Sequence, residues 1–416
     1  MDRQDAGVAG IFRRAGPSFR ERWEGRIDAA RLKVMGAIEA CRTAALGGHI
    51  YACDGCGREH PLYNSCRNRH CPTCQGMAAN RWSEARAAEL LPVPYFHVVL
   101  TLPKEIAAVA FYNRRVVFNI LFQTVAETLR TIAADPQHGG MRIGGTAVLH
   151  TWDQKLRFHP HLHVVVPNAG FDVESGEWKT GSGTFFAPVK VLASFFRRRF
   201  LEELARAHGR GELEFRATVA HLANPGEFHA TLAAARSRDW VVYAKRPFRG
   251  PGQVFRYLAR YTHRIAISDS RITAFDGENV SFRHRKPAEP GQRKPRYGTM
   301  TVSADEFIRR FLLHVLPDGM HRIRHFGILA NGCRARTLES ARKALGPIGC
   351  PDDECVGDDA PEGEREGDEI PVPEAALVAC PHCGAALRLV RDIPRLRPAH
   401  ASRAPPSEQP NHGLQP

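Results

Sequence analysis

The sequence predicts an α+β protein in which helices flank an antiparallel sheet, with a small zinc-ribbon-like domain at the N-terminus. Three observations predict it. Apolar residues recur at helical spacing in several long segments, strand-like β-branched runs follow one another around residues 145–167, and a short block at residues 41–76 concentrates cysteine and histidine. Two strands joined by a short polar stretch pair in antiparallel fashion, so the predicted sheet is antiparallel.

The composition excludes several classes of protein. The chain has 416 residues, enough for two or three domains, and 43% hydrophobic with 25% charged residues is ordinary for a globular protein. No run of eighteen apolar residues occurs, and the N-terminus has no apolar stretch followed by a cleavage site. We therefore expect a cytoplasmic protein without a membrane partner.

The charge is uneven along the chain. The formal net charge is +14; residues 351–416 hold 6 basic and 13 acidic residues, which leaves 52 minus 31, or +21, on residues 1–350. A basic surface of this kind attracts polyanions, because counterions are released from a phosphate backbone on binding. The first 350 residues are therefore expected to contact nucleic acid.

Three regions are predicted. Residues 1–85 form a helical and zinc-binding DNA-recognition domain, residues 86–345 an α+β catalytic domain, and residues 346–416 an acidic linker with a small zinc knuckle and a disordered tail. In the first two regions, helices are expected at 12–40, 77–91 and 104–134, and strands at 95–102, 145–152 and 160–167.

Further elements are expected beyond residue 250. The spacing predicts a helix over Gln253–Ile267 and strands at 277–285 and 297–303. A helix should follow from Ser303, because Ser303 and Glu306 match a capping box.

Two CxxC pairs stand at zinc-ribbon spacing. Cys53 and Cys56 are followed, after 14 residues, by Cys71 and Cys74, and four thiolates complete a closed tetrahedral shell suited to folding and not to catalysis. The same block holds further ligand types that are either a second zinc site or buried packing residues: Cys41, His49, Cys66 and His70. The late pair Cys380 and Cys383 is half of a knuckle, for which Cys333, Cys350 or Cys355 could supply partners.

Cations lie within this cysteine block. Arg58, Arg67 and Arg69 are placed on a loop that the metal would fix, so they are candidates for contact with DNA phosphates.

The segment FHPHLHVVVP indicates a metal site. With a strand period of two, His161 and His163 lie on one face and Leu162 points into the core. Two imidazoles can chelate one ion if a third ligand joins them, and His150, Asp153 or Gln154 are the nearest candidates. The alternative is a surface strand with scattered histidines.

The segment YLARYTHR adds a nucleophile. Tyr257 and Tyr261 are four residues apart and so share one helical face, beside a row of cations at the same spacing, Arg256, Arg260 and Arg264. Cations and a metal ion can hold a scissile phosphate and stabilise a phenolate whose pKa is ordinarily about 10.

These motifs resemble those of the IS91 family of rolling-circle transposases, within the HUH endonuclease superfamily. The resemblance rests on CDGCGREHPLYNSCRNRHCPTCQ, YFHVVLTLP, FHPHLHVVVP, RYLARYTHRIAIS and FIRRFLLHVLPDGMHRIRHFGILAN, which occur in the family's order across residues 53–331. It implies an HUH nuclease core in which His161 and His163 lie on a central strand, with the tyrosine helix alongside.

The resemblance also implies a mechanism. Tyr257 and Tyr261 would attack single-stranded DNA at the element ends, leaving a 5′-phosphotyrosine and a free 3′-OH, with magnesium or manganese at the histidines. No GxxxxGK[ST] loop occurs, so no nucleotide cofactor is expected, and strand separation falls to a host helicase or to replication. Two alternatives remain: a plasmid or phage replication initiator with the same core, and a non-enzymatic zinc-dependent DNA-binding regulator.

Overall fold

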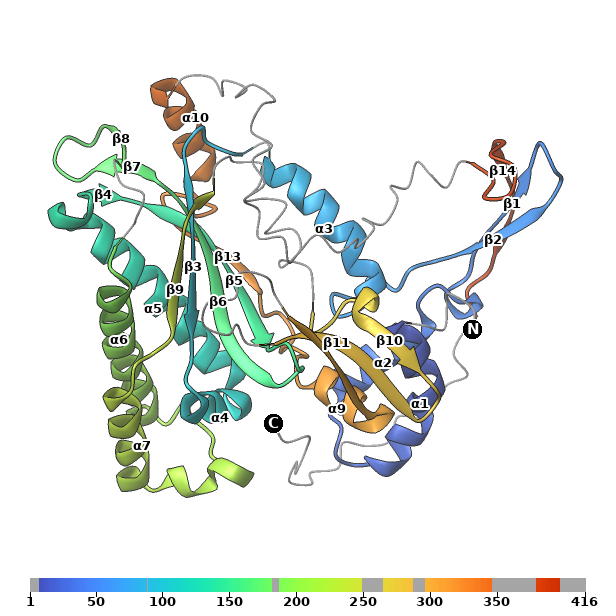
Figure 1. Ribbon diagram of the computed structural model, residues 1–416, viewed down its shortest axis with the longest axis horizontal. Coiled ribbons are helices and arrows are strands. Elements are labelled where there is room, and N and C mark those ends of the chain that lie inside the picture. Colours follow the sequence, from blue (N-terminus) through green and yellow to red (C-terminus); the bar gives the residue numbers. More distant parts are fainter. Residues whose placement is uncertain are drawn as a thin grey trace.

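The structure is a computed structural model that describes residues 7–87, 89–181, 187–248, 265–286, 296–345 and 379–396. Helices alternate with antiparallel sheets, which confirms the predicted α+β class (Figure 1). Within these ranges every helix is too short or too polar to span a lipid bilayer.

A five-stranded antiparallel sheet forms the centre of the fold. Its strands, in spatial order, are β13 (Ile323–Gly327), β5 (Gly144–Trp152), β6 (Phe158–Pro167), β3 (Tyr95–Thr101) and β9 (Val242–Phe248). The strands predicted at 145–152 and 160–167 pair with each other as expected. The strand β6, which carries the FHPHLHVVVP segment, is therefore the central one.

One face of this sheet packs on helices. Val98 and Leu100 of β3 and Leu162 and Val164 of β6 are fully buried in the main hydrophobic core. The helices that cover this face are α4 (Lys104–Tyr112), α5 (Arg114–Ala134), α6 (Val189–Gly209) and α7 (Pro225–Ser237). Because successive residues of a strand point to opposite faces, the residues between these apolar positions, histidines among them, lie on the other face.

A second core joins the N-terminal helices to a later part of the chain. The elements that share it are α1 (Val8–Arg22), α2 (Ala29–Ala40), β10 (Ile272–Phe275), β11 (Asn279–Arg285), β12 (Tyr297–Ser303) and α9 (Ala304–Leu312). The rings of Phe12 and Phe311 meet edge to face with centroids 5.2 Å apart. The domain boundary expected near residue 85 therefore does not separate two cores, because helices before it are buried together with residues after 265.

The helix predicted over residues 303–316 is confirmed at its start. The Ser303 hydroxyl accepts a hydrogen bond from the backbone N–H of Glu306 at 3.2 Å, which is the expected N-cap. The helix predicted over Gln253–Ile267 is wrong at its end. Ile265–Ile267 are not helical, and Ala266 has a φ of 59°. Residues 253–264 lie outside the described ranges.

Further helices and strands of the fold are α3 (Pro72–Ala87), α10 (Arg334–Leu345), β4 (Met141–Arg142), β7 (Ala169–Asp172) and β8 (Trp178–Thr180). The strands β4, β7 and β8 form a small antiparallel sheet beside the N-terminal end of β5.

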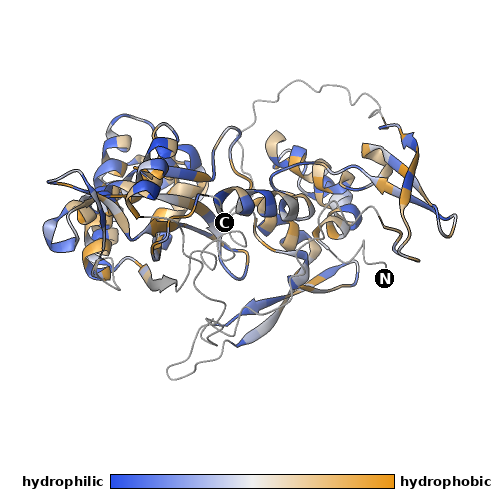
Figure 2. Ribbon diagram, turned by 90° about the horizontal axis from the view of Figure 1, so that it is seen from above, coloured by the Kyte–Doolittle hydropathy of each residue, from blue (hydrophilic) through white to orange (hydrophobic). Residues whose placement is uncertain are grey.

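A separate three-stranded sheet joins strands from residues 48–63 and from residues 387–393. It has the order β14-β1-β2, with β1 at Gly48–Cys53, β2 at Glu59–Tyr63 and β14 at Leu387–Ile393. Both views place it at the opposite end of the molecule from the helices that cover the central sheet (Figure 2). Residues 379–396, which the sequence assigned to a separate C-terminal region, therefore belong structurally to the N-terminal unit.

Candidate functional site

Three histidines gather on the face of the central sheet opposite the helices α4 to α7. His161 and His163 are two residues apart on β6, and His150 on β5 is paired directly with His161. The ring centroids of His150 and His163 are 4.3 Å apart, and those of His161 and His163 are 5.0 Å apart. The ligand nitrogens of all three lie within 4.8 Å of one another, an arrangement that can hold one metal ion.

Hydrogen bonds fix the orientation of the two β6 rings. The Nδ1–H of His161 donates to the backbone carbonyl of His159 at 2.7 Å, and His163 Nδ1 lies 2.9 Å from His97 Nε2. With Nδ1 engaged in this way, Nε2 is the atom through which each ring would bind an ion. Burial lowers the pKa of His161 to about 4, so its imidazole is neutral at pH 7, the form that binds metals.

Of the three predicted third ligands, the structure brings only His150 to the pair. Asp153 lies in the turn between β5 and β6, where its carboxylate accepts hydrogen bonds from the backbone N–H groups of Lys155 and Arg157, both at 2.9 Å. Gln154, in the same turn, accepts from Arg271 through its backbone carbonyl at 2.6 Å. The Asp153 side chain is held within the turn, and the Gln154 side chain accepts from the backbone N–H of Arg285 at 3.4 Å, so neither joins the histidine cluster.

Sequence reasoning missed two buried histidines, His97 beside the cluster and His314 at the turn after β5. His97 on β3 stacks on His163 with centroids 5.1 Å apart, and it alternates with the core residue Val98, a pattern that could have revealed it. His314, just after α9, is buried between Thr151 and Leu156: its Nε2–H donates to the Leu156 carbonyl at 3.2 Å, and its Nδ1 lies 3.1 Å from the Thr151 hydroxyl. It thereby ties α9 to the turn after β5.

The predicted nucleophiles lie outside the described residues. Tyr257 and Tyr261 fall in the range 249–264, as do the basic residues Arg256, Arg260 and Arg264. Their positions relative to the histidines therefore stay predictions.

The eight cysteines of the two chain ends form two clusters of four. The first contains Cys41, Cys66, Cys71 and Cys74, with the Sγ atoms of Cys41 and Cys66 each 3.5 Å from that of Cys74. The second contains Cys53, Cys56, Cys380 and Cys383. Four thiolates around zinc, with Zn–S bonds of about 2.3 Å, are separated by about 3.8 Å in a tetrahedron, so both clusters have the right size.

This grouping differs from the one that the spacing suggested. We expected Cys53 and Cys56 to share an ion with Cys71 and Cys74, but the structure separates these pairs into different clusters. Cys41 and Cys66 join the first cluster, where both thiols lie beside that of Cys74. The backbone N–H groups of Cys56 and Gly55 lower the pKa of the Cys53 thiol to about 6, which favours the thiolate that zinc requires.

Comparisons with known proteins identify both the zinc-binding part and the central part of the chain. A family model described as "Transposase zinc-binding domain" matches residues 11–102, and one described as "Putative transposase" matches residues 144–336. The chain is 51% identical over 346 residues to "Putative transposase y4qJ" of Sinorhizobium fredii, which covers 83% of this chain and 86% of that protein. The chain belongs to the IS91 family of transposases.

A more distant relative supports the same assignment. The transposase is 27% identical over 328 residues to "Transposase for insertion sequence element IS801" of Pseudomonas savastanoi pv. phaseolicola, covering 77% of this chain and 76% of that protein. No solved structure gives a significant match. As a transposase the protein binds DNA, and a zinc-binding domain together with clustered cysteines supports structural zinc.

In the transposase, Arg69 has a different place from the one expected, and His70 takes the packing role that was the alternative to a second zinc site. His70 is buried, and its Nε2 accepts a hydrogen bond from the Leu316 backbone N–H at 3.2 Å. Arg69 donates to the backbone carbonyls of Met320 at 2.6 Å and Pro317 at 2.8 Å. Both therefore attach the zinc-binding unit to the loop after α9, and Arg69 is directed at carbonyl groups, not at a DNA backbone. His49 is not in a cysteine cluster either; its Nδ1 lies 2.7 Å from an Asp392 carboxylate oxygen.

Replacing Arg69 with alanine is expected to destabilise the transposase by about 2–3 kcal/mol, because a charged donor to several carbonyl groups is lost. The measurement is urea denaturation followed by fluorescence. Arg67→Ala is the matched control: Arg67 is exposed, and its removal should change stability by less than about 0.5 kcal/mol. Equal stabilities of the two variants would contradict a docking role for Arg69. Arg58 is likewise exposed and, with Arg67, stays a candidate for DNA contact.

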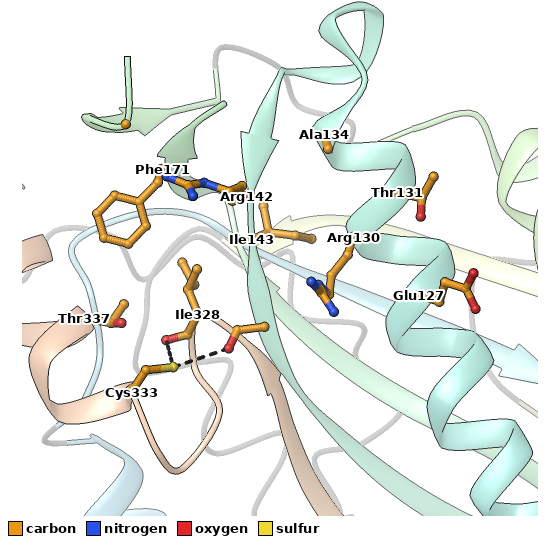
Figure 3. Close-up of a pocket in the computed structure, with 12 residues that line it drawn as sticks. Glu127, Arg130, Thr131, Ala134, Arg142, Ile143, Phe171, Ile328, Cys333 and Thr337 are labelled. Carbon is orange, nitrogen blue, oxygen red and sulfur yellow. Dashed lines mark hydrogen bonds between the residues drawn. The ribbon is translucent and has the colours of Figure 1, made fainter. Parts of the chain in front are cut away.

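A cavity of about 800 Å³ lies away from the histidines, at the Gly144 end of β5 (Figure 3). Its lining includes Arg130, Arg142, Phe171 and Cys333. The Cys333 thiol lies within 3.5–3.6 Å of the backbone carbonyls of Gly327, Ile328 and Ala330. Cys333 therefore does not complete the C-terminal knuckle, and Cys350 and Cys355 lie outside the described residues.

Proposed function

We propose that this transposase cuts and rejoins single-stranded DNA at the ends of its insertion sequence through 5′-phosphotyrosine intermediates formed on Tyr257 and Tyr261. The observation that carries the proposal is the cluster of His150, His161 and His163 on the face of the central sheet that is turned away from the main core. The rings of His161 and His163 are already oriented by backbone and histidine partners, as metal ligands in proteins are. The transposase names of both relatives favour this role over that of a replication initiator.

The proposed reaction conserves the energy of the phosphodiester. A tyrosine Oη forms a bond to phosphorus, the bond between phosphorus and the 3′ oxygen breaks, and that oxygen leaves as a 3′-OH after taking up a proton. A 3′-OH of a second strand can later attack the phosphotyrosine and release the phenol. No nucleotide cofactor is consumed, and separation of the strands is left to a host helicase or to replication.

The residues present fit a divalent cation. When bound, the ion would polarise the scissile phosphate and favour attack by a phenolate. His161 and His163 would hold it through Nε2, with His150 as the third ligand, and His97 would accept the Nδ1–H of His163. Because imidazole binds transition ions more tightly than Mg²⁺, we expect Mn²⁺ to support cleavage at lower concentration than Mg²⁺.

The test is the capture of a covalent species. The protein is incubated with Mn²⁺ and labelled single-stranded DNA from the ends of its element, and the products are separated under denaturing conditions. We expect a labelled protein band with the wild type and none with Tyr257→Phe plus Tyr261→Phe, while duplex DNA binding persists in both. A non-enzymatic DNA-binding regulator would give no band with either protein, and a band that survives in the double variant would exclude these tyrosines as nucleophiles.

Replacing His97 with alanine tests the orientation of His163. We expect the Mn²⁺ concentration for half-maximal cleavage to rise about 10- to 100-fold, with most of the rate recovered at saturating Mn²⁺, because partners that orient a ligand mainly set metal affinity. The measurement is a Mn²⁺ titration of initial rates. His97→Asn keeps a hydrogen-bonding group, so its half-maximal Mn²⁺ concentration should lie between those of the wild type and His97→Ala. An unchanged half-maximal concentration in His97→Ala would show that His97 only packs.

A further inference from the structure

We infer that the second cysteine cluster is a zinc ribbon assembled from the two ends of the chain, in which Cys53 and Cys56 hold a zinc ion together with Cys380 and Cys383. The matched zinc-binding domain spans residues 11–102 and so contains only the first of these two pairs. The inference goes beyond the proposed function and does not depend on it, since the tyrosines and histidines are not involved.

The two cysteine pairs lie on turns of the same construction. Each reads C-x-x-C-G, and the glycines, Gly57 and Gly384, have φ angles of 69° and 75°, which other residues adopt only with strain. The backbone N–H of each glycine donates to the carbonyl of the first cysteine, at 2.9 Å to Cys53 and at 2.8 Å to Cys380. Such turns place two thiolates on one side, as zinc knuckles do.

The thiol groups of the two turns face each other. The Sγ atoms of Cys53 and Cys383 are 3.3 Å apart, and those of Cys56 and Cys380 are 3.8 Å apart, close to the separation of about 3.8 Å around a tetrahedral zinc. Backbone N–H groups also point at the sulfurs: Gly55 and Cys56 donate to Cys53, and His382 donates to Cys380, each at 3.4 Å. These donors stabilise negative charge on the thiolates.

The two turns approach as closely as their backbones allow. A Cβ atom placed on Gly55 would lie 2.7 Å from the Cβ of Ala385, so only glycine fits at that position without a shift. Beside this contact, the backbone N–H of Asp54 donates to the carbonyl of Ala386 at 3.1 Å. The turns are therefore packed against each other and do not merely lie near one another.

The sheet that joins the turns has little else to hold it. β14 pairs with β1 along its length, yet no residue of β14 or β2 is buried. The ion pairs of Arg388 with Asp54 and of Arg391 with Glu59, at 3.5 and 3.7 Å, are exposed and contribute little. A small sheet without an apolar core usually needs a metal ion or a disulfide to be stable, and here the zinc stabilises the sheet.

Counting zinc tests the shared site. Zinc per chain is measured by mass spectrometry of the purified, dialysed protein. We expect Cys380→Ser plus Cys383→Ser to contain one zinc fewer than the wild type, Cys53→Ser plus Cys56→Ser also one fewer, and the variant with all four changes still only one fewer. As the matched control, Cys41→Ser plus Cys66→Ser should lose the zinc of the first cluster. Combined with either of the other pairs of changes, it should contain two zinc ions fewer than the wild type. Unchanged zinc in the C-terminal variant, or a loss of two in the fourfold variant, would overturn the proposal.

A second measurement does not rely on cysteine variants that fold. A protease site is inserted between residues 355 and 370, and the full-length protein is cut there. We expect the fragment that contains residues 379–396 to co-elute with the rest of the protein in zinc buffer and to separate after addition of a chelator. Separation in the presence of zinc, or retention after the metal has been removed, would show that zinc does not join the two ends.

Discussion

A variant with His161→Ala and His163→Ala is expected to lose single-strand cleavage by about a thousandfold, equivalent to about 4 kcal/mol of activation free energy, because the ion that polarises the phosphate is lost. The fold should persist. Both rings lie on the face of β6 that is turned away from the main core, and Leu162 between them keeps its place in that core. Initial cleavage rates at saturating Mn²⁺ measure the effect, with thermal unfolding and duplex DNA binding recorded alongside.

His159→Ala is the matched control for this variant. The ring of His159 is exposed, and the group that positions His161 is the backbone carbonyl of residue 159, which alanine retains. We therefore expect the control to cleave within a few-fold of the wild-type rate. If the double variant cleaved as well as His159→Ala, the histidine cluster would have no part in the reaction; if it unfolded, its role would be structural.

The parts of the central sheet that depend on local sequence patterns could be predicted. The alternation of Leu162 and Val164 with His161 and His163 placed β6 and its two faces correctly, and a polar turn after Trp152 indicated the antiparallel partner. The strand β13 was not foreseen, because it pairs with β5 from more than 170 residues away, at Ile323 against Val148. A short strand of intermediate burial has no periodicity strong enough to reveal that pairing.

The third ligand could not be chosen from sequence. His150, Asp153 and Gln154 all precede the histidine pair by a few residues, and only the register of β5 on β6 decides which side chain faces it. In the structure, His150 is opposite His161, and Asp153 instead accepts backbone hydrogen bonds within the turn. Short acidic side chains commonly make such local bonds in turns, and this competition favours histidine as the ligand.

The sequence identifies the cysteine ligands but does not show which four of them share a zinc ion. A CxxC pair defines a turn by itself, yet which two turns share an ion depends on tertiary structure and cannot be deduced from spacing. The partner of Cys53 and Cys56 comes from residues 380–383, beyond an acidic stretch, whereas the sequence offered Cys333, Cys350 or Cys355 as partners of that late pair. Arg69 was likewise assigned to DNA, and His70 was left open between a zinc site and packing, since nothing local shows that their partners are carbonyl and amide groups of residues 316–320.

Cys41→Ser together with Cys74→Ser is expected to remove zinc from the first cluster and to lower the melting temperature by about 10 °C or more. Structural zinc contributes about 10–16 kcal/mol in isolated zinc-finger peptides, and even a third of this would shift the midpoint by that amount at about 2–4 °C per kcal/mol. The effect should reach beyond the zinc-binding unit, because Cys41, Cys71 and Cys74 are buried in the same core as Phe12 and Phe311.

Two comparisons give this prediction its specificity. Cys333→Ser should keep full zinc content and a melting temperature within about 2 °C of the wild type, since the Cys333 thiol contacts backbone carbonyls of its own loop and belongs to neither cysteine cluster. Cys53→Ser plus Cys56→Ser should lower the main melting temperature less than the Cys41 and Cys74 variant, because the second cluster holds a small sheet with few buried residues. Calorimetry and zinc content measure both. Equal melting temperatures for all three variants would mean that the first cluster does not support the shared core, and that the N-terminal helices are held against α9 by apolar packing alone.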